Sequence, residues 1–512
     1  MAERTCITCT KVFPDTSEYY HSDGRGGLRA DCKWCRSARR RGYYIQIEEV
    51  EPQKKLKKSK MYIVTYAQNA TPVDDKFFAS LKQFAEHNDA QIVVIAGRYR
   101  NPTSIYTQDL VHESWWADAV KPYIFGGVHS PNQNLSIFGN ISIQPTAVRP
   151  LSGFEGHVEH QSGIFGHPKQ ELKTVATDKR SWPRILTTTG ACTVPNYTDS
   201  KAGKKGERRH VLGAAVVEVC GKRFYLRHVS AREDKSFQDL DKLYTPQGVE
   251  SGHRIEALVC GDTHAAFPDE YVDAATFFEE DSVVNVLKPK YVIYHDILSM
   301  RARPKYDWGD LRTRYERHFG EHNSVQEEIE QTIQYVCDAT PSFSQGYVVH
   351  SNHDDHLMEW LNNSKWKDDP ENACLFHRLW YMILEDWHAK GGGKWTSPLK
   401  LWYNQVMGED RIKFLDEDDS LVIAGHACSF HGHNGTNGSR GSIGQFSKLG
   451  VKTVIGHSHS PGIQDHCLQV GVTASLDHGY NSLPSSWFHA HGVLYSDGSR
   501  TLIFIVDGKW KT

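Results

Sequence analysis

The sequence predicts a mixed α/β protein built from more than one domain, and three observations support this fold class. The chain has 512 residues, whereas an ordinary domain has roughly 150. Apolar residues make up 39% and charged residues 24%, so the chain can bury cores. From residue 61 onward, short apolar runs alternate with stretches of helical periodicity. We therefore expect a head at 1–44, a charged linker at 45–60, an α/β accessory domain at 61–250 and a second domain at 251–512.

The composition argues against a membrane protein or a secreted one. The mean hydropathy is -0.54, and the sequence has no run of about 18 apolar residues that could cross a bilayer. Residues 1–13 carry cysteines and charges where a signal peptide needs an apolar stretch. We expect a cytoplasmic protein with no membrane partner, whose seven cysteines outside the head are reduced thiols.

Charge is distributed unevenly along the chain, although the net charge is only -3. Residues 1–60 hold 14 Lys and Arg against 8 Asp and Glu, a balance of +6 that leaves -9 for the remainder. A basic head on an acidic body favours a polyanion as the partner of the head and metal-binding carboxylates in the body.

The accessory region begins with a β-α-β pattern. Residues 62–66 and 91–97 are apolar enough for buried strands, and the aromatic residues of 74–87 recur at helical spacing. Residues 214–219 and 224–227 predict two further strands. The sequence indicates no function for this region beyond shaping the path of a polyanionic partner or forming an oligomer interface.

The second region contains short apolar strands that each end in Asp, His or Asn. The expected strands are 257–260, 291–294, 347–349, 421–424 and 453–455. A helix is expected at 324–337, where Ser324 and Glu327 form a capping box. Because α/β proteins build their sites along one edge of the sheet, at the strand ends, we expect the polar residues to gather there.

These polar residues are of the types that hold two divalent cations. Two cations about 4 Å apart need carboxylates, one of them bridging, to reduce their mutual repulsion. Imidazoles and an amide oxygen complete the ligand shells without excess negative charge. In chain order the strand ends supply Asp262, His264, Asp296, Asn352, His353, Asp354, His431, His433, His457 and His459.

In these motifs the region from Ile255 to about Trp510 resembles the calcineurin-like metallophosphoesterases, whose pattern is D-x-H, GD, GNH[DE], HG and GHxH. The resemblance implies a β-sandwich flanked by helices and two active-site metal ions, Mn²⁺ or Mg²⁺, bridged by Asp296. The other ligands that it implies are Asp262, His264 and His459 for the first metal and Asn352, His431 and His457 for the second.

The sequence departs from the family pattern in places. The second motif reads His295-Asp296 in place of Gly-Asp, and the bridging role requires only the carboxylate. Ser351 stands where the family usually has Gly. The fourth motif is ambiguous among His426, His431 and His433, and we favour His431 because a glycine follows it as in the HG pair.

Three further residues have expected roles beside the metals. The resemblance implies that His353 reaches the phosphate, to stabilise charge or to protonate the leaving oxygen. It also implies that Asp354 orients His353. Arg440 lies in a Gly-rich run shortly after His433, where a single arginine could clamp a phosphate.

The head carries two Cys-x-x-Cys pairs separated by 22 residues, which predicts a structural Zn²⁺ site. Its ligands would be Cys6, Cys9, Cys32 and Cys35. The segment resembles the small zinc-binding heads of some phage HNH endonucleases, but no HNH run follows, so we expect a binding module. We expect its arginines to contact nucleic acid, namely Arg36, Arg39, Arg40 and Arg41. A purely structural zinc knuckle and a protein-docking head are the alternatives.

Two other basic stretches favour a polyanion substrate. Residues 201–209 predict a basic loop, and 301–317 follow the bridging Asp296 closely, with Arg301 and Arg303 as candidate DNA contacts. The C-terminal half also resembles phage-encoded metallophosphoesterases of DNA transfer and host-DNA degradation. That resemblance implies a DNase acting on DNA in the infected host cytoplasm. The alternatives are a phosphatase, a small-molecule phosphodiesterase or a non-catalytic DNA-binding protein, and a homo-oligomer is compatible with the sequence.

Overall fold

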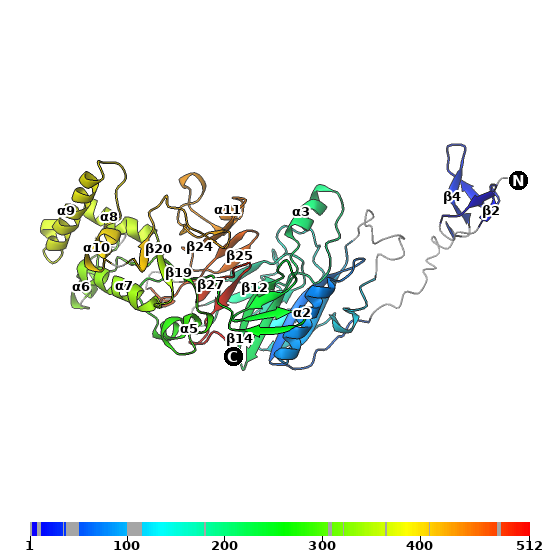
Figure 1. Ribbon diagram of the computed structural model, residues 1–512, viewed down its shortest axis with the longest axis horizontal. Coiled ribbons are helices and arrows are strands. Elements are labelled where there is room, and N and C mark those ends of the chain that lie inside the picture. Colours follow the sequence, from blue (N-terminus) through cyan, green and yellow to red (C-terminus); the bar gives the residue numbers. More distant parts are fainter. Residues whose placement is uncertain are drawn as a thin grey trace.

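The computed structural model describes residues 3–7, 12–33, 35–36, 51–99, 115–178, 181–305, 310–320, 322–363, 366–408, 410–478 and 483–512. The head is a small unit of two antiparallel strand pairs, which lies apart from the rest of the molecule in Figure 1. Its strands are β1 (Glu3–Thr5), β2 (Val12–Pro14), β3 (Tyr20–Ser22) and β4 (Leu28–Cys32).

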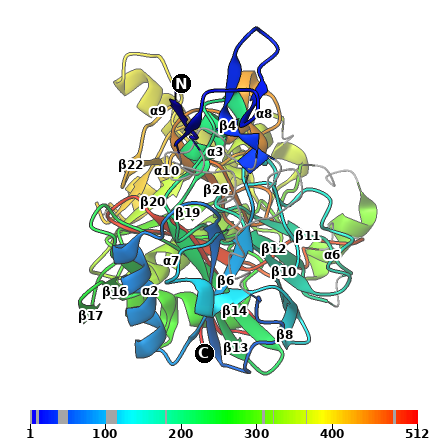
Figure 2. The same ribbon diagram turned by 90° about the vertical axis from the view of Figure 1, so that its right-hand side faces the viewer.

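The first sheet of the body contains five strands in the order β14-β13-β5-β6-β7. Their bounds are β5 (Met61–Gln68), β6 (Gln91–Gly97), β7 (Ile124–Phe125), β13 (Gly213–Cys220) and β14 (Arg223–Ser230). Helix α2 (Asp75–His87) joins the parallel strands β5 and β6, which confirms the predicted β-α-β unit. Phe77, Leu81 and Phe84 bury the apolar face of α2 against this sheet, whose far side faces another sheet (Figure 2).

The second sheet contains six strands in the order β21-β20-β19-β18-β27-β28, and β18 to β21 are parallel. The bounds are β18 (Ala257–Val259), β19 (Tyr291–His295), β20 (Gln345–Val349), β21 (Ile412–Phe414), β27 (Ala490–Leu494) and β28 (Arg500–Phe504).

Helices cover the outer face of the six-stranded sheet (Figure 1). They include α4 (Glu270–Asp273), α5 (Val283–Leu287), α7 (Val325–Ala339), α8 (Asn352–Asn363), α9 (Ala373–Ala389) and α10 (Pro398–Val406). Helix α6 (Leu311–Phe319) precedes α7 and contributes no residue to this core, because its apolar side chains are exposed. Helix α7 begins where the capping box predicted, because the Ser324 hydroxyl accepts a hydrogen bond from the Glu327 N–H. Ile329, Ile333 and Val336 bury the apolar face of this helix.

The third sheet has ten strands and packs against both of the others. Its order is β22-β23-β24-β26-β25-β11-β12-β10-β9-β8. Val64, Val259 and Leu468, one from each sheet, belong to the same core between the layers. The bounds are β8 (Val128–Asn132), β9 (Leu135–Phe138), β10 (Ser162–Phe165), β11 (Leu172–Val175), β12 (Arg184–Thr188), β22 (Val422–Ile423), β23 (His426–Ala427), β24 (Lys452–Ile455), β25 (Gly462–Gln464) and β26 (Cys467–Gln469).

The ten-stranded sheet crosses the boundary that the sequence places at residue 250. Strands β11 and β25 pair antiparallel at its centre, with Leu172 opposite Ile463. The accessory region therefore shares a continuous sheet with the C-terminal region. A small sheet of β15 (Phe237–Asp239), β16 (Lys242–Thr245) and β17 (Gly248–Ser251) completes the described strands of the accessory region.

The predicted basic loop at 201–209 is wrong: these residues form helix α3 (Lys201–Arg209), which the Ser200 side chain caps by accepting from the Gly203 N–H. The short helix α11 (Ile443–Phe446) lies on β25 and β26. Within the described ranges, no helix combines the length and apolar character that crossing a bilayer requires.

Candidate metal centre

Five separate segments of the chain meet at one end of the six-stranded sheet. Asp262, Asp296 and Asn352 follow the carboxyl ends of the parallel strands β18, β19 and β20. These ends meet at one edge because the strands run in the same direction. His431 and His457 reach the same place from the facing ten-stranded sheet, after β23 and β24.

The first group contains the side chains expected to hold the first metal, together with the expected bridge. The ligand atoms of Asp262, His264, Asp296 and His459 all lie within 4.8 Å of one another. His459 Nε2 is 3.1 Å from Asp262 Oδ2, and His264 Nε2 is 3.4 Å from Asp296 Oδ2. All four residues are buried, with at most 4% of their surface exposed.

The second group contains the side chains expected to hold the second metal. The Asn352 amide oxygen lies 3.1 Å from both His431 Nε2 and His457 Nδ1. His431 Nε2 is also 3.7 Å from Asp296 Oδ2. Asp296 thus lies between the two groups.

The buried polar atoms of this site fit divalent cations. Among the described residues, neither carboxylate oxygen of Asp262 has a hydrogen-bond partner, and neither do Asp296 Oδ1 and His431 Nδ1. Burial raises the pKa of the Asp262 carboxyl well above its usual value and that of Asp296 to about 6. Buried acceptors without donors are costly, and ligation of a cation with oxygen and nitrogen preference removes that cost.

Burial also keeps the histidines in the form that binds metals. It lowers the pKa of His457 and of His459 to about 4, and it lowers those of His264 and His431 well below the usual value. These imidazoles are therefore neutral at neutral pH, as metal ligation requires.

The backbone at the site is held in an uncommon conformation. His264, Asp296, His457 and His459 have positive φ angles of 42°, 50°, 71° and 58°. Non-glycine residues rarely adopt this region, which costs free energy and occurs preferentially at functional sites. The strained turns aim these side chains back across the strand ends.

His353 lies beside the two groups, and its neighbour Asp354 does not play the expected part. His353 Nε2 is 3.8 Å from Asp296 Oδ2, and its Nδ1 is 2.8 Å from the Ser299 carbonyl oxygen, which orients the ring. Asp354 instead accepts hydrogen bonds from the Ser351 N–H and hydroxyl. Successive side chains on a helix point in different directions, so Asp354 at the start of α8 cannot face its neighbour.

The structure separates the three histidines of the ambiguous fourth motif. Only His431 touches Asn352 among them in the described contacts. His426 starts β23 after a tight hairpin turn, and its Nδ1 lies 3.1 Å from the Ala424 carbonyl oxygen. His433 Nε2 lies 3.8 Å from Asp355 on α8.

The arginines expected near the metals have different surroundings. Arg440 is exposed and close enough to help lower the pKa of His457, after burial and two neighbouring histidines. Arg301 stacks over the Phe267 ring at 4.9 Å. The Arg303 guanidinium forms a paired salt bridge with the buried Asp369, at 2.6 and 2.8 Å, so it is engaged within the protein, and its expected contact with DNA stays a prediction.

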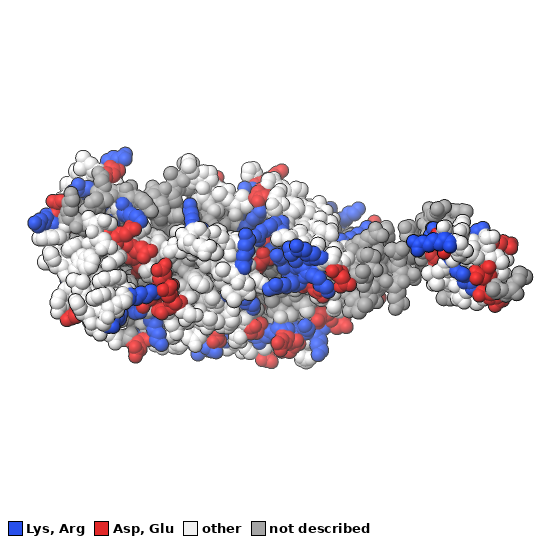
Figure 3. All heavy atoms as spheres, turned by 90° about the horizontal axis from the view of Figure 1, so that it is seen from above, with Lys and Arg blue, Asp and Glu red and all other residues white. Residues whose placement is uncertain are grey.

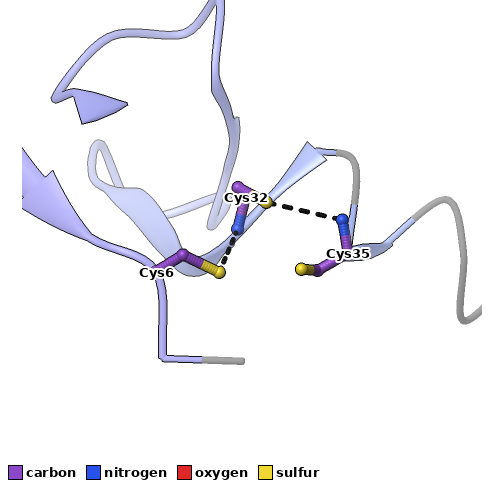
Figure 4. A group of neighbouring side chains, drawn as sticks. All are labelled: Cys6, Cys32 and Cys35. Carbon is purple, nitrogen blue, oxygen red and sulfur yellow. Dashed lines mark hydrogen bonds between the residues drawn. The ribbon is translucent and has the colours of Figure 1, made fainter. Parts of the chain in front are cut away.

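The head contains a second candidate metal site. Cys6, Cys32 and Cys35 are buried and their sulfur atoms lie within 4.8 Å of one another (Figure 4). Backbone N–H groups of Cys32 and Cys35 donate to the sulfurs of Cys6 and Cys32, an arrangement suited to thiolates. Arg36 follows this cluster and is half-buried. Outside the described residues lie Cys9, Arg39, Arg40 and Arg41.

Sequence reasoning gave no role to three residues around the two ligand groups. The His478 ring lies 5.0 Å from that of His264, and the Trp487 ring lies 4.1 Å from that of His459. His295 is fully buried 5.6 Å from the His431 ring, and neither of its ring nitrogens has a hydrogen-bond partner among the described residues. The Asp477-His478 pair was the only signal for the first. His295 was noted only as a departure from the family pattern, and nothing in the sequence distinguished Trp487.

Comparison with known proteins places the chain beside a phage protein. It is 34% identical over 467 residues to "Protein A1" of Escherichia phage T5, covering 89% of this chain and 83% of that protein. No family model and no solved structure matches the chain. An identity of this level along nearly the whole length shows common ancestry, and the chain therefore belongs to the family of phage T5 protein A1.

Proposed function

We propose that this protein is a metal-dependent nuclease that hydrolyses DNA phosphodiester bonds, with a dinuclear centre of the metallophosphoesterase type. The observation that carries the proposal is the convergence of seven side chains from distant segments, with Asp296 between two ligand groups. Carboxylates, imidazoles and one amide oxygen form a ligand set suited to Mn²⁺ or Mg²⁺.

The second ligand group is more exposed than the first, which indicates where a phosphate enters. The first ligand group is fully buried, whereas Asn352, His353 and His457 are partly exposed. Arg440 is exposed on the same side. A phosphodiester therefore approaches over the second group.

Each residue on the open side has a task that its position supports. Two bound cations supply a Lewis-acidic surface that neutralises phosphate charge and lowers the pKa of water. His353, held by the Ser299 carbonyl oxygen, presents Nε2 toward the leaving oxygen as a proton donor. Arg440 offers a guanidinium to a non-bridging phosphate oxygen. Asp296 fixes the spacing of the two ligand groups.

DNA is the proposed substrate because the chain combines this centre with a basic head. The cysteine cluster provides a zinc-stapled module, and residues 1–60 carry an excess of positive charge. Kinship with a phage protein agrees with action on host DNA in the cytoplasm of an infected bacterium.

The experiment compares cutting of plasmid and linear DNA by wild type and Asp296→Asn with Mn²⁺ or Mg²⁺. Asp338→Asn, an identical change on the exposed face of α7, is the matched control. We expect metal-dependent cutting that Asp296→Asn loses and Asp338→Asn keeps. Absence of cutting of every DNA form with every divalent metal refutes the proposal.

The same assays discriminate the rival functions. A phosphatase or small-molecule phosphodiesterase would turn over nitrophenyl phosphate esters much faster than DNA. A DNA-binding or transfer protein whose metals are structural would bind DNA with a steep salt dependence and show no turnover of any ester.

A further inference from the structure

The accessory region repeats the architecture of the metal-binding region. In the ten-stranded sheet, β8-β9-β10-β12-β11 has the same connections as β22-β23-β24-β26-β25, and the two sets meet at the antiparallel pair β11 and β25. In the facing layer, β14-β13-β5-β6 corresponds to β28-β27-β18-β19. Both sets also agree in which neighbours run parallel and which antiparallel.

Backbone hydrogen bonds set the register between the two copies. The Asp262 N–H donates to the Gly471 carbonyl, and the Thr473 N–H donates to that of Asp262. Tyr66 has the same two bonds, to Gly190 and from Cys192. Tyr66 therefore occupies the position of Asp262 in the first copy.

Glycine contacts extend the register to the GHxH motif. A Cβ on Gly456 would meet Asp262 and His295, and a Cβ on Gly166 would meet Tyr66 and its sheet neighbour Ile95. Gly166 thus corresponds to Gly456.

Counting on from these glycines, Lys169 takes the place of His459. Since Ile95 lies where His295 lies in the second copy, the next residue, Ala96, takes the place of Asp296. At these positions the first copy has exchanged metal ligands for a tyrosine, an alanine and a cation.

A basic cavity of about 670 Å³ opens beside Lys169, where the two copies meet. Eight Lys and Arg side chains line it against two Asp. Lys205, Arg208 and Arg209 come from α3 in the first copy, whereas Lys448, Lys452 and Arg500 come from the second. Figure 3 shows Lys and Arg gathered over α3 on this side of the molecule.

Most of this positive charge is not neutralised within the protein. Asp465 accepts salt bridges from Lys169, Arg209 and Arg149, at 3.1, 2.8 and 3.7 Å. One carboxylate therefore serves three cations, although Lys169 also pairs with Glu171. The buried Arg209 Nη1 has no hydrogen-bond partner among the described residues.

The second copy's side of the cavity is also short of anions. The Arg500 guanidinium donates to the carbonyl oxygens of His466 and Asp465, and Lys452 Nζ donates to that of Gly498. Carbonyl oxygens satisfy these donors geometrically but carry no formal charge. An anion with several oxygens supplies what the protein lacks here.

We propose that this cavity binds the phosphate backbone of DNA without cutting it. It would be a second DNA site, to which the first copy contributes basic side chains in place of metal ligands. It lies away from the metal centre, since Lys452 begins β24 and Gly456 follows its other end. At about 3.3 Å per strand residue, the two ends are roughly 13 Å apart. When the phosphate to be cut lies at the metal centre, the cavity would hold a neighbouring stretch of the same DNA backbone. This inference rests on DNA being the substrate of the proposed function.

The experiment measures DNA binding by the full chain without added Mn²⁺ or Mg²⁺, so that no cutting occurs and the head keeps its zinc. The test variant is Lys205→Ala with Lys448→Ala, two exposed cavity lysines. The matched control is Lys76→Ala with Lys82→Ala, two exposed lysines of α2. All proteins keep the head, so a difference between the pairs reports the cavity.

We expect the test pair to weaken binding of a labelled DNA of 20 base pairs by about tenfold at 0.15 M salt. The slope of log K against log salt should fall by about 2, because each lost phosphate contact lowers it by roughly 0.9. Turnover of a small diester should stay at the wild-type level, and the control pair should behave as wild type.

Two results overturn the inference. The first is a test pair that binds DNA with wild-type affinity and slope. The second is that the wild type binds free ATP but not DNA, and that the Lys205→Ala, Lys448→Ala variant loses the binding of ATP. This result would make the cavity a nucleotide site. The outcome is separable from the proposed function: DNA cutting with unaltered binding refutes only the cavity, and lost binding without any cutting in metal refutes only the nuclease.

Discussion

Replacing Gly456 with alanine should disable the metal centre while leaving the backbone unstrained. Gly456 does not have a positive φ, so alanine can adopt its conformation. The added Cβ, however, would lie 2.2 Å from Asp262 Oδ1 and 3.2 Å from the His295 side chain. Ordinary contacts begin near 3.4 Å, so the Asp262 carboxylate must move by more than 1 Å.

The size of the effect follows from that displacement. Asp262 is fully buried among the other side chains of the first ligand group, so a displaced carboxylate no longer lies where that group requires it. A misplacement of about 1 Å in a catalytic constellation costs on the order of 100-fold in rate. We therefore expect Gly456→Ala to cut DNA about 100-fold more slowly and to bind Mn²⁺ more weakly, with a stability loss of about 1–3 kcal/mol from overpacking.

Gly166→Ala provides the matched control at the corresponding position of the first copy. Its Cβ would lie 2.4 Å from Ile95 Cγ2, a comparable clash in a place without metal ligands. The assays are calorimetric Mn²⁺ titration, plasmid cutting and urea unfolding of both variants. We expect similar destabilisation and a loss of metal binding only in Gly456→Ala. Equal metal affinity in the two variants would refute the assignment of Asp262 as a ligand.

Three further predictions concern the head, a buried acid and a buried ion pair. Cys6→Ser should release one zinc ion and weaken DNA binding while hydrolysis of a small diester persists; joint loss would make the head part of the catalytic unit. Burial, with Asp269 adding to it, raises the pKa of Asp273 to about 6, so its contribution to stability is present below pH 4 and lost as the pH rises through 6. The free energy of unfolding of Asp273→Asn in urea should therefore exceed that of wild type by about 3 kcal/mol at pH 8 and equal it at pH 4. A difference that does not change with pH would contradict this. Arg303→Met should lower the free energy of unfolding by about 3–5 kcal/mol, because it leaves Asp369 buried without its partner. Weaker DNA binding at unchanged stability would instead indicate that Arg303 contacts DNA.

Local patterns in the sequence predicted the elements well. Helix α7 begins at the capping residue that the sequence shows, because a cap depends on neighbours three positions away. Helix α2 lies where the aromatic spacing of 74–87 predicted a helix. The alternation of strands with helices also placed Asp262, Asp296 and Asn352 at strand ends, where parallel strands bring them together.

Contacts between distant segments could not be predicted from the sequence. The partner of Arg303 is Asp369, which lies 66 residues further along the chain, so the arginine looked available for DNA. The hairpin at Ala424 turns His426 away from the site, and its spacing from the strand gave no sign of this turn. The repeated fold was hidden because Tyr66, Ala96 and Lys169 replaced the ligands that make the motif recognisable.

The central claim is that two cations share the Asp296 carboxylate. Crystals of the full chain grown with Mn²⁺ and measured at the manganese absorption edge test it directly, because each ion gives its own anomalous peak. The account predicts two peaks about 4 Å apart, one within reach of Asp262, His264 and His459 and the other within reach of Asn352, His431 and His457. A single peak that does not touch Asp296, or none at full Mn²⁺ loading, would contradict it.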